Sequence, residues 1–142
     1  MTWYLDTSAA LKLLVEESES ATLAGLIDAE SADLVSALLL ETELRRAASR
    51  SPYLSQGAVT EFLEGVSLND MPRSLCTEAG LVGGANLRSL DALHLASAIR
   101  CGATHLVTYD KRLIDSAHHM GVRVLSPGAH STPDGLPPAP AP

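Results

Sequence analysis

Short apolar runs alternate with longer stretches of helical spacing along this chain. The runs that are typical of strands lie near residues 2–6, 34–36, 66–68, 105–108 and 122–125. Apolar positions recur at helical spacing over residues 9–15, 21–29, 38–50, 56–64, 72–81, 90–100 and 111–120. Strands that alternate with helices form a parallel sheet covered on both faces. The pattern therefore predicts an α/β protein, an α/β/α sandwich with a central, mostly parallel sheet flanked by helices.

The alternation stops near Ser126, and the chain ends in the run Pro-Pro-Ala-Pro-Ala-Pro over residues 137–142. We therefore expect one domain over residues 1–127, a size at which folding buries roughly two thirds of the surface. Residues 128–142 are expected to form a disordered or polyproline-like tail. Recognition of this tail by a groove of the SH3 type is the less favoured alternative.

The composition is that of a globular protein, with 46% hydrophobic and 4% aromatic residues. The sequence has neither an apolar run of the roughly 18 residues that cross a bilayer nor the features of a signal peptide. We therefore expect a cytoplasmic protein without a membrane segment. Its two cysteines, Cys76 and Cys101, lack the close spacing of a zinc or redox motif, and we expect both to be buried.

The charge balance disfavours a generic basic module for nucleic acids, because 10 Lys and Arg residues face 17 Asp and Glu residues, a formal net charge of −7. An acidic chain can still act on RNA if bound cations neutralise its acids and its basic residues cluster. Arg45, Arg46 and Arg50 form such a cluster, although a solvated helix face explains them equally well. The acidic balance also favours a basic protein partner.

Four acidic residues stand at positions where an α/β protein exposes side chains: Asp6, Glu43, Asp91 and Asp110. Asp6 and Asp110 each follow an apolar run and therefore lie at the carboxyl end of a predicted strand. Ligands of open α/β sheets gather outside these strand ends. Carboxylates that converge there suit hard divalent cations, so the sequence predicts a metal site and metal-assisted hydrolysis of a phosphodiester.

Each acid also has a purely structural explanation. Asp6 and Asp110 are both suited to cap the helix that follows them. Asp91 lies in the first turn of its helix, where a carboxylate interacts favourably with the helix dipole. Glu43 stands three residues before Arg46 and could form an intrahelical ion pair. Helical periodicity does not choose between Glu43 and the neighbouring Glu41.

Local sequence strings resemble the successive motifs of PIN-domain ribonucleases, and most closely those of VapC-type toxins from toxin–antitoxin pairs. The resemblance covers about residues 1–127 in the order of the family, and the string at 87–96 is the most specific. The strings are YLDTSA at 4–9, TELRRA at 42–47 after Val35-Ser36, LRSLDALHLA at 87–96 and LVTYDKRL at 106–113.

The resemblance implies that Asp6 and Asp91 are the principal ligands of Mg²⁺ or Mn²⁺. It also implies that Glu43 and Asp110 complete the acidic pocket. Glu43 is preferred to Glu41 because the family's glutamate is followed by an apolar residue and then an arginine-alanine segment.

Further residues are expected to support these acids. The hydroxyls of Thr7, Ser8 and Thr108 stand beside them in the sequence and are expected to orient them. Asp115, a little more than one helical turn after Asp110, is a minor candidate for the same pocket. His94, three residues after Asp91, is expected to be a packed, hydrogen-bonded histidine and not a zinc ligand.

The family also implies an activity and partners. A bound divalent ion would activate a water for attack on the RNA phosphodiester, which predicts products with 5′-phosphate and 3′-hydroxyl ends. The expected partners are the RNA substrate, a cognate VapB-type antitoxin with a basic segment that blocks the acids, and a second copy of the chain in a homodimer.

Two other classes of function remain open from the sequence. An aspartyl phosphotransfer protein also exposes an aspartate at a strand end. The phosphatase form usually has a second acid two residues later, whereas Asp6 is followed there by Ser8. A non-catalytic domain that holds a basic peptide in an acidic groove is the second alternative.

Overall fold

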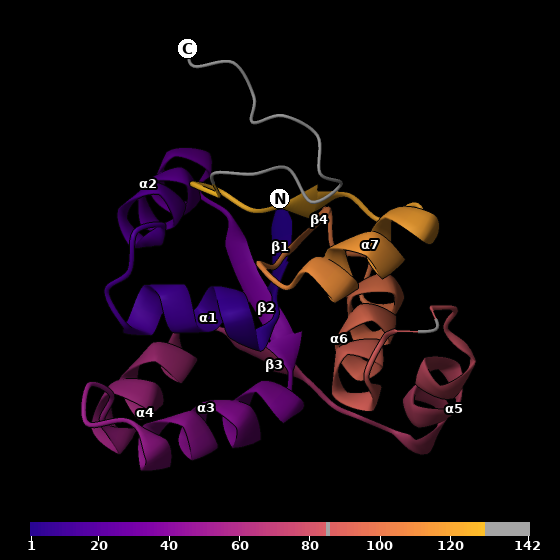
Figure 1. Cartoon of the computed structure of the whole chain (residues 1–142), viewed down its shortest axis with the longest axis horizontal. Coiled ribbons are helices and arrows are strands. Elements are labelled where there is room, and N and C mark those ends of the chain that lie inside the picture. Colours follow the sequence, from indigo (N-terminus) through magenta and orange to yellow (C-terminus); the bar gives the residue numbers. More distant parts are fainter. Residues whose placement is uncertain (85, 130–142) are drawn as a thin grey trace.

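The computed structural model describes residues 1–84 and 86–129 (Figure 1). The strands are β1 (Thr2–Leu5), β2 (Asp33–Ala37), β3 (Ser67–Asn69), β4 (His105–Val107) and β5 (Val124–Leu125). The helices are α1 (Thr7–Leu14), α2 (Ser20–Glu30), α3 (Leu39–Arg50), α4 (Gln56–Glu64), α5 (Arg73–Leu81), α6 (Ser89–Arg100) and α7 (Lys111–His119). Each predicted strand and helix is present, and the predicted bounds of α4 are those of the structure.

The five strands form one parallel sheet in the order β3-β2-β1-β4-β5. The chain first adds β2 and β3 on one side of β1, then returns to add β4 and β5 on the other. In sheets of this kind the ligand site lies at the carboxyl ends of the strands where the order reverses. Leu5 pairs with Val107, so the residues that follow β1 and β4 emerge side by side at this edge.

Alternate side chains of β1 enter different layers of the core. Trp3 and Leu5 pack with α1 and α2, whereas Tyr4 packs with α6 and α7 on the opposite face of the sheet. Figure 1 shows the corresponding arrangement, with α1 to α4 on one side of the strands and α5 to α7 on the other. Because β1 is buried on both faces, its apolar run is continuous, as the sandwich prediction requires.

The surface departs from the sequence predictions in one respect. Cys76 and Cys101 are exposed, so the prediction that both are buried is wrong. Both lie at or next to the solvent-facing side of a helix that packs by its other face, Cys76 on α5 and Cys101 just after α6. The apolar character of cysteine did not decide the helix register; the leucines and alanines of α5 and α6 did.

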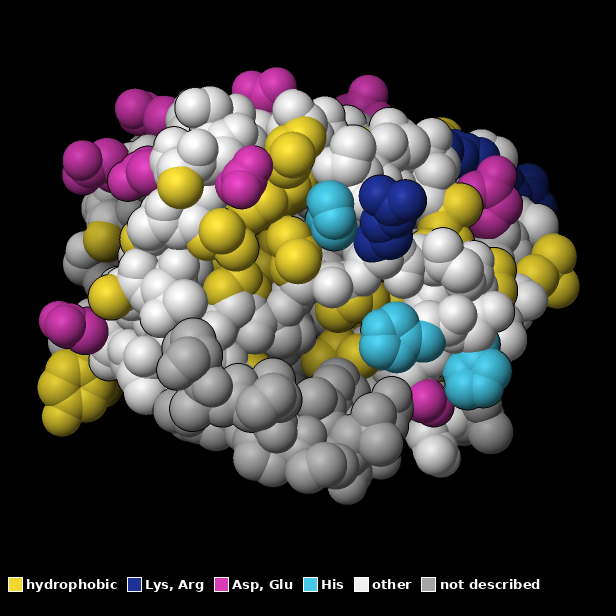
Figure 2. Space-filling model, turned by 90° about the horizontal axis from the view of Figure 1, so that it is seen from above, with side chains coloured by type: hydrophobic (Ala, Val, Ile, Leu, Met, Phe, Trp, Pro, Cys, Tyr) yellow, Lys and Arg dark blue, Asp and Glu magenta, His cyan; other side chains and the backbone are white. Residues whose placement is uncertain are grey.

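Acidic side chains are unevenly distributed on the surface. On the face drawn in Figure 2, most Asp and Glu side chains lie toward the upper left edge, and the Lys and Arg side chains lie toward the right, where an acidic side chain adjoins them. The net charge of −7 is therefore compatible with local basic regions. Among the described residues no helix has the length and apolarity to span a membrane. Residues 130–142, most of the predicted tail, lie outside the described residues.

Replacing Leu106 with Ala tests the core between the sheet and α6 and α7. Leu106 on β4 is fully buried, so its truncation is expected to lower the free energy of unfolding by about 2–5 kcal/mol. Leu81→Ala is the matched control, because Leu81 is 81% exposed and its loss should cost less than about 0.5 kcal/mol. Urea unfolding of both variants measures the difference, and equal losses would contradict this description of the core.

Candidate metal and catalytic centre

The carboxylate of Asp6 is buried and accepts three hydrogen bonds. Asp6 follows β1 and caps α1, since its Oδ1 accepts from the Ala9 amide at 2.9 Å and from the Ser8 hydroxyl at 2.7 Å. Its Oδ2 accepts from the Thr108 hydroxyl at 2.6 Å. Burial raises the pKa of Asp6, although the nearby His94 and these hydrogen bonds oppose the shift. Asp6 is therefore both the predicted helix cap and a carboxylate held in one orientation.

Thr108 connects this carboxylate to a second predicted site residue. Its hydroxyl oxygen accepts from the Asp110 amide at 3.1 Å while it donates to Asp6. Asp110 in turn caps α7, because its Oδ1 accepts from the amides of Arg112 at 2.9 Å and Leu113 at 3.2 Å. The two strand ends are thus joined by one threonine, which places the loop of Asp110 beside Asp6.

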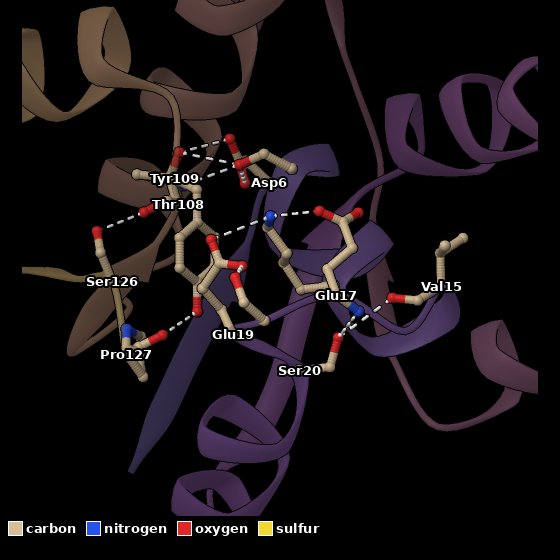
Figure 3. Close-up of polar contacts among 12 residues, drawn as sticks. Asp6, Val15, Glu17, Glu19, Ser20, Thr108, Tyr109, Ser126 and Pro127 are labelled. Atoms are coloured by element: carbon tan, nitrogen blue, oxygen red, sulfur yellow. Dashed lines mark hydrogen bonds and ion pairs between the residues drawn. The ribbon is translucent and has the colours of Figure 1, made fainter. Parts of the chain in front are cut away.

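The same loop is held by the segment that follows β5 (Figure 3). The Ser126 hydroxyl donates to the Thr108 carbonyl at 2.6 Å, and the Tyr109 hydroxyl donates to the Pro127 carbonyl at 2.7 Å. From the β1 side, the Ser8 hydroxyl accepts from the Tyr109 amide at 2.9 Å. These contacts hold the loop between β4 and α7 from two sides, from α1 and from the segment after β5.

Glu43 is oriented by a chain of hydrogen bonds that crosses the sheet. Its Oε1 lies 2.5 Å from the Thr7 hydroxyl and 2.7 Å from His94 Nε2. The buried His94 contacts the Tyr4 hydroxyl through Nδ1 at 2.8 Å. Because a carboxylate only accepts hydrogen bonds, Nε2 donates to Glu43, and the ring links Glu43 to Tyr4. Burial raises the pKa of Glu43, but the His94 and Thr7 hydrogen bonds outweigh it, so the pKa lies below its ordinary value.

The structure separates Glu43 from Glu41. Glu41 forms an exposed ion pair with Arg45, at 3.0 Å and one helical turn away, on the outer side of α3. Glu43 contacts Thr7 and His94, so the alternative of an ion pair with Arg46 is wrong. The part of the site that the sequence did not predict is the bond from His94 to Glu43. Its only sequence signal is the position of His94 on the same helix as Asp91, three residues later.

Asp91 has the fewest polar partners of the four predicted acids. It lies half-buried in the first turn of α6, and none of the hydrogen bonds or ion pairs of the described residues involves its carboxylate. Burial raises its pKa to about 6, and the charges of Asp110, Asp6 and Glu43 add to this shift. Asp91 therefore lies within the electric field of the other three predicted acids.

The donor set suits a hard divalent cation. Every candidate ligand is a carboxylate oxygen, and the repulsion acting on Asp91 is relieved by a bound positive ion. Among the described residues no three acidic, histidine or cysteine side chains are grouped around one point, and Mg²⁺ is commonly held by one or two carboxylates with waters as its other ligands. Asp115 is placed elsewhere: it is exposed on α7, with its Oδ1 3.9 Å from His119 Nδ1.

The fold and the acidic edge define an α/β protein with a carboxylate centre at the switch point of a parallel sheet. A family model described as the PIN domain matches residues 3–118. Ribonuclease VapC47 of Mycobacterium tuberculosis (strain CDC 1551 / Oshkosh) is 36% identical over 132 residues, which cover 89% of this chain and 97% of that protein. Ribonuclease VapC35 of strain ATCC 25618 / H37Rv is 36% identical over 131 residues, 88% of this chain and 96% of that protein. The chain therefore belongs to the PIN-domain family and, within it, to the VapC ribonucleases.

Solved structures support the same fold. The VapBC2 complex from Rickettsia felis, bound to a DNA fragment from its promoter, contains a chain that matches with a TM-score of 0.63 and 18% identity, covering 88% of this chain and 98% of that one. VapC20 of Mycobacterium tuberculosis, a toxin that cleaves the Sarcin-Ricin loop, matches with a TM-score of 0.65 and 15% identity, covering 80% and 94%. At these identities the likeness establishes the fold alone.

Replacing Asp91 with Asn tests the repulsion in the metal-free site. Because the pKa of Asp91 is raised from 3.8 to about 6, the folded protein binds more protons than the unfolded chain between these values, and its stability falls as pH rises through this window. Without divalent ions, the wild type is expected to lose about 1 kcal/mol relative to Asp91→Asn between about pH 4 and pH 7, after allowance for screening by solvent. Urea unfolding in chelator at both pH values measures this. The same pH dependence in both proteins would show that the ionisation of Asp91 does not destabilise the metal-free site.

Replacing His94 with Leu tests the chain of hydrogen bonds from Tyr4 to Glu43. The change leaves two buried or half-buried polar groups without their partner, and we expect the free energy of unfolding to fall by about 1–3 kcal/mol. Glu41→Gln is the control, because it breaks only an exposed ion pair and should cost less than about 0.5 kcal/mol. Urea unfolding of the two variants gives the comparison, and a decrease for His94→Leu as small as the control's would show that the chain of hydrogen bonds contributes nothing.

Proposed function

We propose that this protein is the toxin of a toxin–antitoxin pair, an endoribonuclease that hydrolyses RNA phosphodiester bonds with a divalent metal ion at the carboxylate centre. The observation that carries the proposal is the Asp91 carboxylate, which has a pKa raised by burial and by Asp110 and Asp6 and has no hydrogen bond among the described residues. Such a group favours a bound cation. The curated relatives, which are named ribonucleases, support the reaction class.

The four acids take different parts in this proposal. Asp6 and Asp91 are the principal ligands of Mg²⁺ or Mn²⁺, while Glu43 and Asp110 complete the acidic pocket. When bound, the ion activates a water and neutralises charge on the phosphate. Glu43 stays ionised near neutral pH because its pKa is lowered, so its carboxylate can orient a water by accepting a hydrogen bond.

The hydroxyl residues position these acids. Thr108 and Ser8 donate to Asp6, and Thr7 donates to Glu43. Partners that orient metal ligands in this way typically contribute roughly 10–100-fold to metal affinity or activity. The sequence expectation that these three hydroxyls serve the acids thus has a structural basis in their hydrogen bonds.

The proposed partners follow from the relatives and from the charge. The VapBC2 structure is a complex of a VapC chain with its VapB partner, which favours a VapB-type antitoxin for this chain as well. A basic segment of the antitoxin would compensate the same carboxylates that otherwise bind the ion. A homodimer and a cytoplasmic location, where RNA substrates are found, belong to the same proposal.

Cleavage of labelled total RNA by the purified, antitoxin-free protein tests the function. The assay compares Mg²⁺, Mn²⁺ and chelator, with Asp6→Asn as the inactive control. Discrete fragments that need the ion, carry 5′-phosphate and 3′-hydroxyl ends and vanish in the variant are expected. Cyclic-phosphate ends would refute the metal route, and no cleavage by folded wild type would favour the alternative of a non-catalytic acidic groove that binds a basic peptide.

A matched pair of glutamate variants tests which acid of α3 serves the site. Glu43→Gln removes a charge from the acidic pocket and is expected to lower kcat by more than the roughly 10–100-fold that an orienting partner contributes. Glu41→Gln makes the same chemical change two residues away, where the side chain forms an exposed ion pair with Arg45, and activity is expected to be retained. Single-turnover cleavage of a substrate identified in the total-RNA assay provides the rates; equal decreases would mean that the assignment of Glu43 is wrong.

A further inference from the structure

A cavity of about 620 Å³ lies beside the carboxylate centre, between the connection of α5 to α6 and one face of α7. We call it the α7 cavity. Its volume is within the range of roughly 300–1,000 Å³ that is typical of small-molecule sites. The polar and glycine residues of its lining that matter here are Gly84, Asn86, Lys111, Arg112, Ser116 and His119.

The close packing of Gly84 on Ser116 fixes the shape of the cavity. Gly84 has a φ of +130°, and a Cβ at this position would lie 2.6 Å from the Ser116 hydroxyl oxygen. Ser116 is buried, so it cannot turn away into solvent. The Leu87 amide donates to the Gly84 carbonyl at 3.2 Å and closes the turn that follows. The wall and the helix therefore meet at a distance that only glycine permits.

Both walls of the α7 cavity are continuous in sequence with residues of the carboxylate centre. The connection that contains Gly84 and Asn86 enters α6, whose first turn holds Asp91. Lys111 and Arg112 follow Asp110, the cap of α7. Asp91 and Asp110 are near enough for the charge of one to raise the pKa of the other. The α7 cavity is therefore walled by the segments that adjoin Asp91 and Asp110 in the chain.

The lining of the cavity contributes two cationic side chains, those of Lys111 and Arg112. Among the hydrogen bonds and ion pairs of the described residues, none involves the side chains of Lys111 or Arg112. Three other basic residues are paired with acids, Lys12 with Glu17 and Glu19, Arg45 with Glu41, and Arg100 with Glu78.

The remaining groups of the lining suit a nucleotide. Arg112, Ser116 and His119 lie on one face of α7, because they are spaced by four and three residues. Asn86 belongs to the lining on the side of the connection between α5 and α6. Asp115 also belongs to the lining, but its carboxylate lies near His119 and is exposed.

We propose that the α7 cavity binds a nucleotide of the RNA strand next to the scissile bond, with Lys111 and Arg112 in contact with its phosphate. This inference rests on the proposed ribonuclease function and names the part of the chain that holds the substrate. Phosphate contacts position a strand without reading its sequence. The α7 cavity therefore contributes affinity and register, while the acids carry the chemistry.

Binding of a fluorescein-labelled single-stranded RNA tests the proposal. The full chain carries Asp6→Asn to prevent cleavage, and fluorescence anisotropy is measured from about 50 to 200 mM KCl. Lys111→Ala with Arg112→Ala is expected to weaken binding roughly 10- to 30-fold at low salt. It should also reduce the slope of log affinity against log salt by about 0.7 for each phosphate that is no longer neutralised, or about 1.4 for the pair.

Two matched variants separate a local interaction from a change in net charge. Arg73→Ala with Arg123→Ala removes the same number of cations away from the cavity and is expected to leave affinity and slope near those of the parent. Lys111→Arg with Arg112→Lys keeps both charges and should restore both. Asp115→Asn removes a negative charge from the lining and is expected to tighten binding several-fold, so the proposal is also tested by an increase in affinity.

Cleavage assays of the same variants without Asp6→Asn separate failure of the cavity assignment from failure of the proposed ribonuclease function. For the Lys111 and Arg112 variant, KM is expected to rise by a factor similar to the decrease in affinity, with little change in kcat. If the wild type cleaves RNA while this variant keeps its affinity, slope and KM, the cavity assignment fails and the ribonuclease stands. An equal decrease in affinity in the Arg73 and Arg123 variant also overturns the assignment. A folded wild type that neither binds nor cleaves RNA overturns both.

Discussion

The Asp6 carboxylate lies almost wholly out of solvent between β1 and β4, and a charge in that position is costly unless it is hydrogen bonded. Three donors of this chain hydrogen bond to it: the Ser8 hydroxyl, the Ala9 amide and the Thr108 hydroxyl. Because Thr108 also accepts from the Asp110 amide, the compensation of one acid sets the position of the next. The geometry of the edge between β1 and β4 thus follows from the need to bury a single charge.

Glu43 and Asp91 differ in whether neighbouring side chains hydrogen bond to their carboxylates. Glu43 is held by Thr7 and His94 and has a lowered pKa, whereas Asp91 is half-buried without such partners among the described residues and has a pKa raised to about 6. Environments that push the pKa values of neighbouring acids apart are characteristic of functional sites. The same surplus of negative charge explains why a divalent ion and a basic segment of a partner would both be attracted to this edge.

Most of the fold could be predicted from the sequence because its signals are local. The alternation of strand and helix patterns, the proline and glycine boundaries and the strand-end acids Asp6 and Asp110 all lie within short windows. The bond between His94 and Glu43 could not be predicted this way, because it joins residues 51 positions apart through the packing of α3 and α6 against one sheet. The burial of Cys76 and Cys101 was predicted wrongly for a related reason, since helix register is set by the stronger apolar residues.

An acidic protein that acts on RNA has to attract a polyanion past its own carboxylates. The long-range field of a chain with net charge −7 opposes this approach, so the attraction must come from groups within a few ångströms of the strand, where screening by salt is weak. A divalent ion at the acids supplies one such group. Cations that are already paired, such as Lys12 with Glu17, contribute little more. In the proposed function Lys111 and Arg112, which have no side-chain partner among the described residues, supply the other. The two together would let a small acidic domain hold RNA without a basic face.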